Sequence, residues 1–380
     1  MLYAKSNAER YKGLINEKTD YNIVNALLDF NSSVSPDSKV IEQLPFYYPQ
    51  LFVNTSSNYN EFWYGREKEV EQAEKSIHRY FSGYKGAIAV LGEPGAGKSF
   101  FVNYICRNFN KDDVYTIKPP ETGSTNKIDF FASIQNATNN KGKPENILKE
   151  MPKGSVVIID DLELWWEKTI GGNKLIEYIF ELINKFNKKI LFIVVSNEFV
   201  ANTIYNLNDV SELFINFIKL QPQNAEVIKN IVLTRHRAGG LELNYKNKSL
   251  NSLSEITIAN LFLKHSKFSN GNINSALKLW LANIVDFNDN TIQVAMPNIN
   301  TSLIDDIDID NLVILNQFVL HKHLTISKIS RILREDKETV KYKLEFMLRS
   351  GIIVKQNNYY LINPFMSVYL IQLLKNRNII

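Results

Sequence analysis

A glycine-rich stretch at residues 92–99 holds the residue types best suited to binding phosphate. It reads GEPGAGKS, which fits the spacing G-x-x-x-x-G-K-[ST]. Glycines let the backbone wrap closely round an anion, so that successive N–H groups point at phosphate oxygens. We expect Lys98 to bring a positive charge to the terminal phosphates of a nucleotide, and Ser99 to bring a hydroxyl ligand for Mg²⁺. The expected phosphate-site residues are Gly92, Glu93, Pro94, Gly95, Ala96, Gly97, Lys98, Ser99 and Phe100.

The segments on either side of this loop have the character that phosphate binding requires. Residues 87–91 form an apolar run of strand length, and residues 100–105 continue as the first turns of a buried helix. A helix that begins at Lys98 directs the positive end of its dipole at the phosphates. The pattern therefore predicts a strand, a loop and a helix that together bind a nucleoside triphosphate with Mg²⁺.

A second group of chemically active residues is acidic. Residues 155–159 are an almost continuous β-branched run, typical of a parallel strand that is covered on both faces. The run ends in Asp160 and Asp161, with Glu163 two residues further on. Ligands of doubly wound sheets bind at the carboxyl ends of the strands. We expect Asp160 to hold the magnesium shell.

Further apolar runs predict the rest of a parallel sheet. Strands are expected at 114–118, 190–195 and 214–220, which with the two strands above gives a three-layer α/β nucleotide-binding fold. From Asn224 onward the pattern turns helical. Helices are expected at 225–236, 251–265 and 271–284.

The C-terminal pattern predicts a winged helix-turn-helix domain. Three helices are expected, then a hairpin about residues 356–358, then a last helix; the helical segments are 311–321, 325–334, 336–349 and 364–376. The chain is therefore expected to divide into four parts. These are an N-terminal extension at 1–55, a nucleotide-binding core at 56–222, a helical lid at 223–304 and the winged helix at 305–380.

Composition and charge limit the classes of function. The chain has 380 residues, 44% of them hydrophobic, and a single cysteine, Cys106, so no disulfide forms within it and a reducing cytoplasm is expected. No apolar run approaches the roughly 18 residues of a membrane span. Residues 311–380 carry 11 Lys and Arg against 4 Asp and Glu, a net charge of +7, whereas the first 310 residues sum to −3. A basic C-terminal end favours an acidic partner such as duplex DNA.

Together these motifs resemble the AAA+ and STAND-type P-loop ATPases, in particular the origin-recognition initiator branch, over about residues 60–380. The resemblance implies ATP as the nucleotide and a nucleotide-dependent homo-oligomer. In that branch a Gly-Arg-Glu element ahead of the first strand lines the adenine pocket, which implies that Tyr64, Gly65 and Arg66 contact the base or ribose. It also implies that Asn197, after the fourth strand, hydrogen-bonds the γ-phosphate or the attacking water.

Three departures from that resemblance bear on catalysis. No arginine occurs between Asn108 and Thr234, where the arginine finger of AAA+ rings falls, and the remaining candidates are Arg235 and Arg237. The helix that begins near Gly271 carries Asn274 where the resemblance implies arginine. The resemblance implies that Asp161 positions the attacking water, with Glu163 as the alternative for that task. Many AAA+ proteins carry glutamate at the position of Asp161, whereas aspartate, one methylene shorter, resembles the STAND pattern. We therefore expect slow hydrolysis by isolated protomers.

Two classes of function remain open from the sequence. The first is an ATPase that acts on DNA through its winged helix, which the charge distribution favours. The second is a signalling or regulatory switch whose winged helix binds a protein partner or autoinhibits, which the aspartate pair and the missing arginines favour.

Two aromatic segments carry expectations about packing. The tryptophans Trp165 and Trp166 are adjacent, and we expect that one of them is exposed or lies at an interface, where it either contacts a partner or packs under the N-terminal extension. The proline-broken segment 44–52 is expected to pack on a neighbouring domain.

Overall fold

The structure, a computed structural model, describes residues 17–53, 62–208, 210 and 212–380. Residues 1–16, 54 and 55 of the expected N-terminal extension lie outside the described residues. The chain divides into two units. We call the unit made of Arg66–Gln221 and Phe318–Thr325 the core unit, and the unit made of Met1–Gly65, Pro222–Gln317 and Ile326–Ile380 the composite unit. The expected four-part division of the chain stays a prediction.

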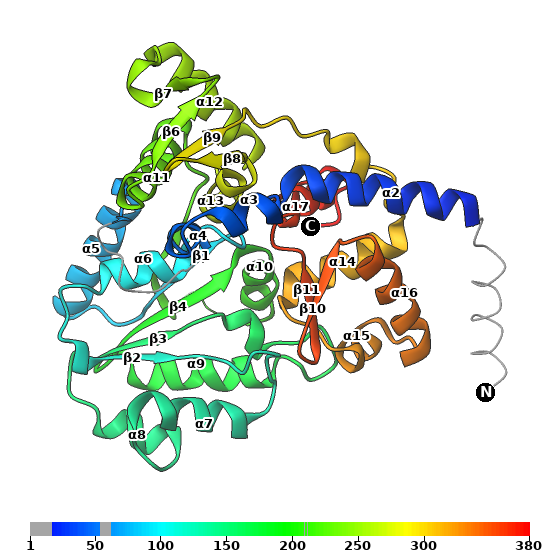
Figure 1. Cartoon of the computed structure of the whole chain (residues 1–380). Helices are drawn as coiled ribbons and strands as arrows, with labels where there is room; N and C mark the ends of the chain where they lie inside the picture. The colour runs from blue at the N-terminus through cyan, green and yellow to red at the C-terminus, as the bar shows by residue number, and fades with distance from the viewer. Residues whose placement is uncertain (1–16, 54–61, 209, 211) are drawn as a thin grey trace, which may run out of the picture. The chain divides into compact units, whose positions relative to one another are not determined.

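A parallel sheet with strand order β2-β3-β4-β1-β5 forms the middle layer of the core unit (Figure 1). Its strands are β1 (Ala87–Gly92), β2 (Val114–Ile117), β3 (Val156–Ile159), β4 (Leu191–Asn197) and β5 (Phe214–Lys219). All neighbouring pairs are parallel, and Gly92 lies opposite Asn197 in the register of β1 with β4. The phosphate loop, the acids after β3 and Asn197 are therefore collected at one edge of the sheet.

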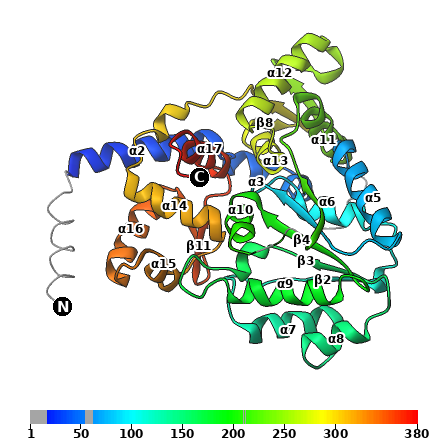
Figure 2. The ribbon, with the colours of Figure 1, turned by 180° about the vertical axis from the view of Figure 1, so that it is seen from behind.

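Helices cover both faces of this sheet. They are α5 (Glu67–Phe81), α6 (Lys98–Ile105), α7 (Lys127–Thr138), α8 (Pro144–Glu150), α9 (Lys174–Phe186) and α10 (Glu198–Leu207). Helices α7, α8 and α9 lie on one side of the sheet and α5 and α6 on the other (Figures 1 and 2). This is the expected three-layer P-loop nucleotide-binding fold, and the predicted strands are confirmed within one or two residues.

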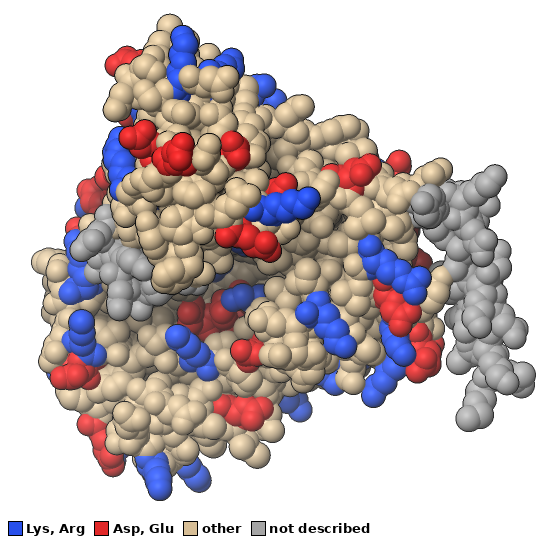
Figure 3. Space-filling model, in the orientation of Figure 1, with Lys and Arg blue, Asp and Glu red and all other residues tan. Residues whose placement is uncertain are grey.

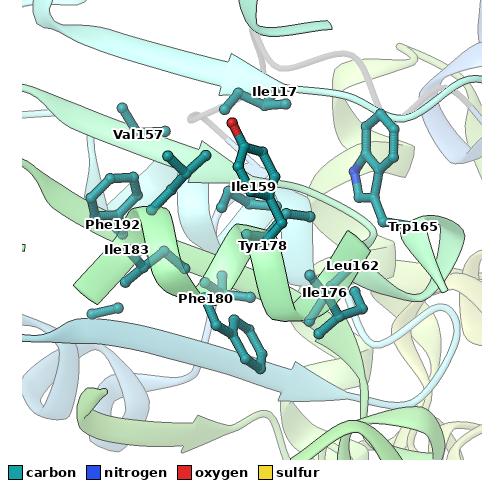
Figure 4. Close-up of a cluster of buried hydrophobic side chains, with 14 of the residues drawn as sticks. Ile117, Val157, Ile159, Leu162, Trp165, Ile176, Tyr178, Phe180, Ile183 and Phe192 are labelled. Atoms are coloured by element: carbon teal, nitrogen blue, oxygen red, sulfur yellow. The ribbon is translucent and has the colours of Figure 1, made fainter. Parts of the chain in front are cut away.

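Helix α9 shows why these residues form this layer. Its buried side chains recur every three or four residues and include Ile176, Ile179 and Ile183. They pack against Val157 and Phe192 of the sheet, as Figure 4 shows for several members of this cluster. Each fully buried aliphatic or aromatic side chain of this kind contributes about 1.5–3 kcal/mol. That packing holds the strand ends that carry the site in a fixed register.

Both adjacent tryptophans are buried, so the expectation that one is exposed or at an interface is wrong. Trp165 is 0% exposed and Trp166 3%. The short 3₁₀ helix Leu162–Trp165 ends between them, and Trp166 continues in an extended conformation, so the two rings do not follow one regular element. The ring of Trp166 stacks on that of His321, with centroids 5.0 Å apart and planes at 18°. The ring of Trp166 is therefore covered by a residue of the segment Phe318–Thr325, which lies far along the chain but belongs to the core unit.

The composite unit contains the N-terminal helices and the helices that follow the sheet. They are α2 (Glu17–Val34), α3 (Ser38–Gln43), α4 (Tyr47–Val53), α11 (Ala225–Ala238), α12 (Glu255–Phe268) and α13 (Ile273–Ala282). Segment 44–52 packs on α13 within this same unit, because Tyr48 and Phe52 contact Trp280.

The composite unit also holds a sheet that the sequence pattern does not predict. Its strand order is β7-β6-β9-β8, with β6 (Glu242–Tyr245), β7 (Lys248–Ser249), β8 (Ile284–Asn288) and β9 (Thr291–Val294). These strands are short, and β6 pairs in parallel with β9, which lies after two intervening helices. Neither β6 nor β9 is long enough to be predicted as a strand from its own sequence.

The C-terminal elements follow the expected order of helices and hairpin. They are α14 (Ile309–His321), α15 (Ile326–Leu333), α16 (Lys337–Arg349), β10 (Ile353–Gln356), β11 (Tyr359–Ile362) and α17 (Ser367–Asn376). Strands β10 and β11 pair antiparallel. This order is compatible with a winged helix. Helix α14 is shared, because residues 309–317 belong to the composite unit and 318–321 to the core unit. Among the described residues, no helix combines the length and apolar character needed to cross a membrane.

Candidate nucleotide-binding site

The phosphate loop joins β1 to α6 and has the backbone conformation that its glycines allow. Gly95 has φ 81° and Gly97 has φ 86°, both in the left-handed region that disfavours residues with a Cβ. Gly97 is also the residue that caps the N-terminus of α6. The loop therefore turns tightly and delivers its chain into a helix whose positive dipole end faces the loop.

Lys98 is held by the loop itself. Its Nζ donates to the carbonyl oxygens of Gly92 at 2.9 Å and Glu93 at 3.2 Å. Burial lowers the pKa of the Lys98 ammonium, and the neighbouring carboxylates of Glu163 and Asp161 oppose that shift. Neutral carbonyls are weaker acceptors than phosphate oxygens. The ammonium is therefore placed where an anionic ligand of the loop would replace those carbonyls.

Ser99 and Asp160 lie together, as the sequence predicts for two metal ligands. The Ser99 hydroxyl is 3.3 and 3.5 Å from the two carboxylate oxygens of Asp160. Burial, and then the charge of Asp161, raise the pKa of Asp160. Among the described residues there is no group of three or more His, Cys, Asp or Glu side chains that could hold a metal. One hydroxyl and one carboxylate fit Mg²⁺, which keeps several waters and takes its other ligands from phosphates.

Asp161 stands at the same edge in a strained backbone conformation. Its φ is 46°, which is unusual for a residue other than glycine, and it caps the 3₁₀ helix that follows. Its Oδ2 accepts a hydrogen bond from Lys322 Nζ at 2.6 Å, and its side chain is 25% exposed. The structure thus brings Asp161 to the expected place, with a lysine partner that the sequence did not predict.

Glu163 and Asn197 are more deeply enclosed. Glu163 is 3% exposed, and its Oε2 accepts the backbone N–H of Asn197 at 3.0 Å. Burial, and then the charge of Asp161, raise the pKa of Glu163. The amide oxygen of Asn197 caps α10 by accepting the N–H of Phe199, and its Nδ2 donates to the carbonyl of Val319 at 2.7 Å. Asp161 is therefore the more accessible of the two carboxylates proposed to position water.

The three residues expected to contact adenine do not belong to one unit. Tyr64, which is 44% exposed, and Gly65 belong to the composite unit, whereas Arg66 belongs to the core unit. Arg66 is 5% exposed, and its guanidinium donates to the carbonyls of Ala96 at 2.6 Å and Gln221 at 3.2 Å. Arg66 therefore ties the phosphate loop to the end of the sheet, a contact that the sequence reasoning missed.

The two arginines considered for action in trans have different surroundings. Arg235 is buried, and its guanidinium carbon lies 5.1 Å from the centre of the Phe62 ring. Its Nη1 donates to the carbonyl of Ile231 within the same helix. Arg237 is exposed at the end of α11. Arg237 is therefore the more accessible of the two.

The central part of the core unit matches a known protein family. Residues 88–216 match the family model described as "ATPase family associated with various cellular activities (AAA)". No match is found among curated protein sequences.

Solved structures with a similar arrangement include three proteins at low sequence identity. The ORC2 protein of Aeropyrum pernix is 12% identical with a TM-score of 0.46, and the similarity covers 87% of this chain and 98% of that chain. Cdc6p of Pyrobaculum aerophilum is 13% identical with a TM-score of 0.39, covering 86% and 96%. The RuvB Holliday junction branch migration motor of Thermotoga maritima is 13% identical with a TM-score of 0.40, covering 82% and 96%.

The family match spans the strand before the phosphate loop, the loop itself, the acidic strand end and Asn197. Lys98, Ser99 and Asp160 lie together within it, as nucleotide chemistry requires. Residues 88–216 therefore form an ATPase domain of the AAA family.

Proposed function

We propose that the protein binds Mg-ATP at residues 92–99, hydrolyses it slowly and acts as a nucleotide-dependent switch. The observation that carries this proposal is the approach of Ser99 Oγ to within 3.3 Å of Asp160, beside the loop that holds Lys98. Ser99 and Asp160 would hold the metal, which neutralises phosphate charge when bound. Lys98 would bind the terminal phosphates, and Asp161 would orient the attacking water, with Glu163 as the alternative.

Slow turnover follows from what surrounds the site. An arginine finger contributes about 10³–10⁵ in rate where one is present, and no arginine lies between Asn108 and Thr234. Asp161 is also engaged by Lys322. We expect dilute protein to turn over ATP less than about once per second, at the low end of the enzyme range. Steady-state phosphate release measured over a range of protein concentrations tests this, and fast turnover by monomers would contradict it.

A switch also requires different affinities for nucleotide in two conformations. The proposed lid at 223–304 and the C-terminal residues are the parts whose arrangement would change with nucleotide. A nucleotide-dependent homo-oligomer would be one consequence. A cytoplasmic location is also proposed, because Cys106 is the single cysteine of the sequence and no disulfide can form within the chain.

The C-terminal helices are proposed to bind duplex DNA. On α16, Lys337, Lys341 and Arg349 are exposed, whereas Leu344 and Met347 are buried and anchor the helix. Exposed basic side chains on an anchored helix are suited to contact phosphates.

Two observations limit the strength of this basic face. Lys343 of the same helix is paired with Glu335 at 2.8 Å, so part of its charge is already satisfied. Figure 3 shows acidic side chains among the basic ones where α15 and α16 lie. We therefore expect binding to DNA to be weak and strongly dependent on salt.

The salt dependence of binding tests the DNA proposal. Each phosphate contact that is lost should flatten the slope of log affinity against log salt by roughly 0.9. Fluorescence anisotropy with labelled duplex and ATP should give a slope flatter by about 1.8 for Lys337→Ala/Lys341→Ala than for wild type. The exposed pair Lys264 and Lys267 on α12, changed to alanine, is the matched control and should leave the slope unchanged. Binding that is absent at low salt would contradict the proposal.

A second function is favoured by the place of residues 318–325. This segment belongs to the core unit although it consists of the last turn of α14 and the loop that leads to α15. A switch that autoinhibits through its C-terminal region, or releases that region to a protein partner, would use such a link. Size-exclusion chromatography with light scattering, run apo, with ADP and with a slowly hydrolysed ATP analogue, each with and without duplex DNA, separates the two functions. Assembly that depends on nucleotide but not on DNA favours the second.

A further inference from the structure

Residues 318–325 contact the carboxyl edge of the central sheet at several points. The Val319 carbonyl accepts from Asn197 Nδ2 at 2.7 Å, and Lys322 Nζ donates to Asp161 Oδ2 at 2.6 Å. Nδ1 of His323 lies 2.6 Å from the carbonyl oxygen of Glu121. The segment thus contacts the chain that follows β2 and β3 and the end of β4. The resemblance to AAA+ ATPases implies that both Asn197 and Asp161 act on the attacking water or the γ-phosphate.

The segment is packed as well as hydrogen-bonded. The ring of His321 stacks on Trp166, and Leu320 is buried within the main apolar cluster of the core unit. These apolar contacts hold the end of α14 in place. The position of the Lys322 side chain therefore does not depend on its ion pair alone.

The backbone of Lys322 is in an unusual conformation. Its φ is 61°, in the left-handed region, and its N–H donates to the carbonyl of Phe318 at 2.8 Å. Glycine or asparagine usually occupies this position after the last turn of a helix, because a side chain makes the conformation unfavourable. Such outliers persist where the surrounding structure imposes them, and they cluster at functional sites.

Lys322 is surrounded by the charges of the nucleotide site. Burial opposes its charge, but the carboxylates of Asp161, Glu163 and Asp160 outweigh that effect and raise its pKa. The ammonium therefore stays charged at neutral pH. The hydrogen bond from the Lys322 ammonium occupies Asp161 Oδ2 and stabilises the negative charge, which makes the carboxylate a weaker base toward a water molecule.

We propose that Lys322 is a further residue of the ATPase site, which restrains hydrolysis by holding the Asp161 carboxylate until residues 318–325 leave the sheet edge. This inference rests on the proposed function. Residues 318–321 are the last turn of α14, and the earlier residues of that helix belong to the composite unit. Movement of the segment away from the sheet edge would therefore also move the rest of α14. Lys322 would therefore couple the state of the nucleotide site to the C-terminal region.

The sign of one mutational effect separates this proposal from its main competitor. If Lys322 restrains Asp161, then Lys322→Gln should raise single-turnover hydrolysis by about two- to fivefold, the range of a partly exposed ion pair. If Lys322 instead stabilises phosphate charge in the way an arginine finger does, the same substitution should slow hydrolysis. Lys322→Arg keeps the charge and should remain close to wild type. Lys188→Gln, at an exposed lysine of the core unit, is the matched control.

A double substitution tests whether the effect acts through Asp161. Against an Asp161→Asn background, Lys322→Gln should no longer change the residual turnover, because the restrained carboxylate is absent. An equal increase in both backgrounds, a decrease, or no change in the wild-type background would each overturn the proposal.

Hydrogen exchange provides a readout independent of turnover. In nucleotide-free protein, Lys322→Gln should speed amide exchange at residues 318–325, whereas the control Lys188→Gln should leave exchange in that segment unchanged. Unchanged exchange in that segment would overturn the restraint. Calorimetry with Mg-ATP on the wild type distinguishes the two proposals. Lack of ATP binding would refute the proposed function itself. Normal ATP binding, together with Lys322 variants that do not behave as predicted, would refute this inference alone.

Discussion

Clustered polar groups are stabilised in two different ways in the two units. At the sheet edge of the core unit they are charged, and the buried Glu163 lies in one cluster with the partly or largely exposed Lys98, Asp160, Asp161 and Lys322. In the composite unit the buried polar groups around Trp280 are neutral and satisfy one another. Trp280 Nε1 donates to the Tyr48 hydroxyl at 3.1 Å, and that hydroxyl is hydrogen-bonded to Nδ1 of His236 at 2.9 Å.

The difference indicates that the neutral groups around Trp280 serve stability and that the charged groups at the sheet edge serve the site. The neutral groups lie in a stacked aromatic cluster, where Trp280 also packs face to face with Phe262, with planes at 10°. Every polar atom named there has a partner, so the cluster stabilises the fold by packing and hydrogen bonding. The charged cluster carries shifted pKa values and two left-handed backbones, at Asp161 and Lys322. Such features are costly, and they concentrate where a site must act on a ligand.

The largest expected effect is on the charged cluster. Asp161→Asn should slow ATP hydrolysis by about 10²- to 10⁴-fold while ATP affinity is preserved, because a positioned base contributes on that order. Phosphate release and calorimetry on the same preparation check both parts. Glu163→Gln is the comparison, since Glu163 is enclosed and bonded to the Asn197 N–H. Normal turnover by Asp161→Asn together with inactive Glu163→Gln would show that Glu163 is the catalytic carboxylate.

The next effect concerns binding. Lys98→Ala should weaken ATP affinity by about 10- to 150-fold, the equivalent of ~1.5–3 kcal/mol for a hydrogen bond to a charged group. Lys322→Gln should change ATP affinity far less, because its partner is a carboxylate of the protein and not the phosphate loop. Isothermal titration with Mg-ATP measures both. Unchanged affinity in Lys98→Ala would refute the assignment of residues 92–99.

The smallest expected effect is a loss of folding stability at acidic pH, caused by the two histidines of the neutral cluster around Trp280. Burial, helped by the charge of Arg237, lowers the pKa of His236 to about 4. Burial also lowers the pKa of His265 to about 4, although its hydrogen bond to the Ala276 carbonyl opposes the shift. The unfolded chain takes up these protons below about pH 6.5, whereas the folded cluster stays neutral down to about pH 4. Stability should therefore fall with pH in that interval, by at most roughly 1.4 kcal/mol per pH unit per histidine.

Urea unfolding at pH 7 and pH 5 measures this loss. His265→Gln should make the dependence on pH shallower, and His78→Gln, at an exposed histidine of α5, should leave it unchanged. A midpoint that does not move between the two pH values would mean that the cluster accepts charge without cost.

The fold of the core unit could be predicted from the sequence because its signals are local. The GEPGAGKS stretch, the β-branched run before Asp160 and the apolar strand before Asn197 each lie within ten residues. A strand that is buried on both faces needs such a run, whatever the rest of the chain does. The sheet β7-β6-β9-β8 could not be predicted in the same way, since its short strands become strands only when they pair.

The candidate site divides along the same line. The sequence by itself determined Lys98, Ser99 and the acids after β3, because a loop and two parallel strand ends must meet at one edge of the sheet. Only the tertiary structure decided that Arg66 holds the loop, that Trp166 is covered by His321, and that Lys322 reaches Asp161 from 161 residues further along the chain. Contacts between such distant residues depend on where helix α14 ends and how its end packs, and no periodicity within either segment carries that information.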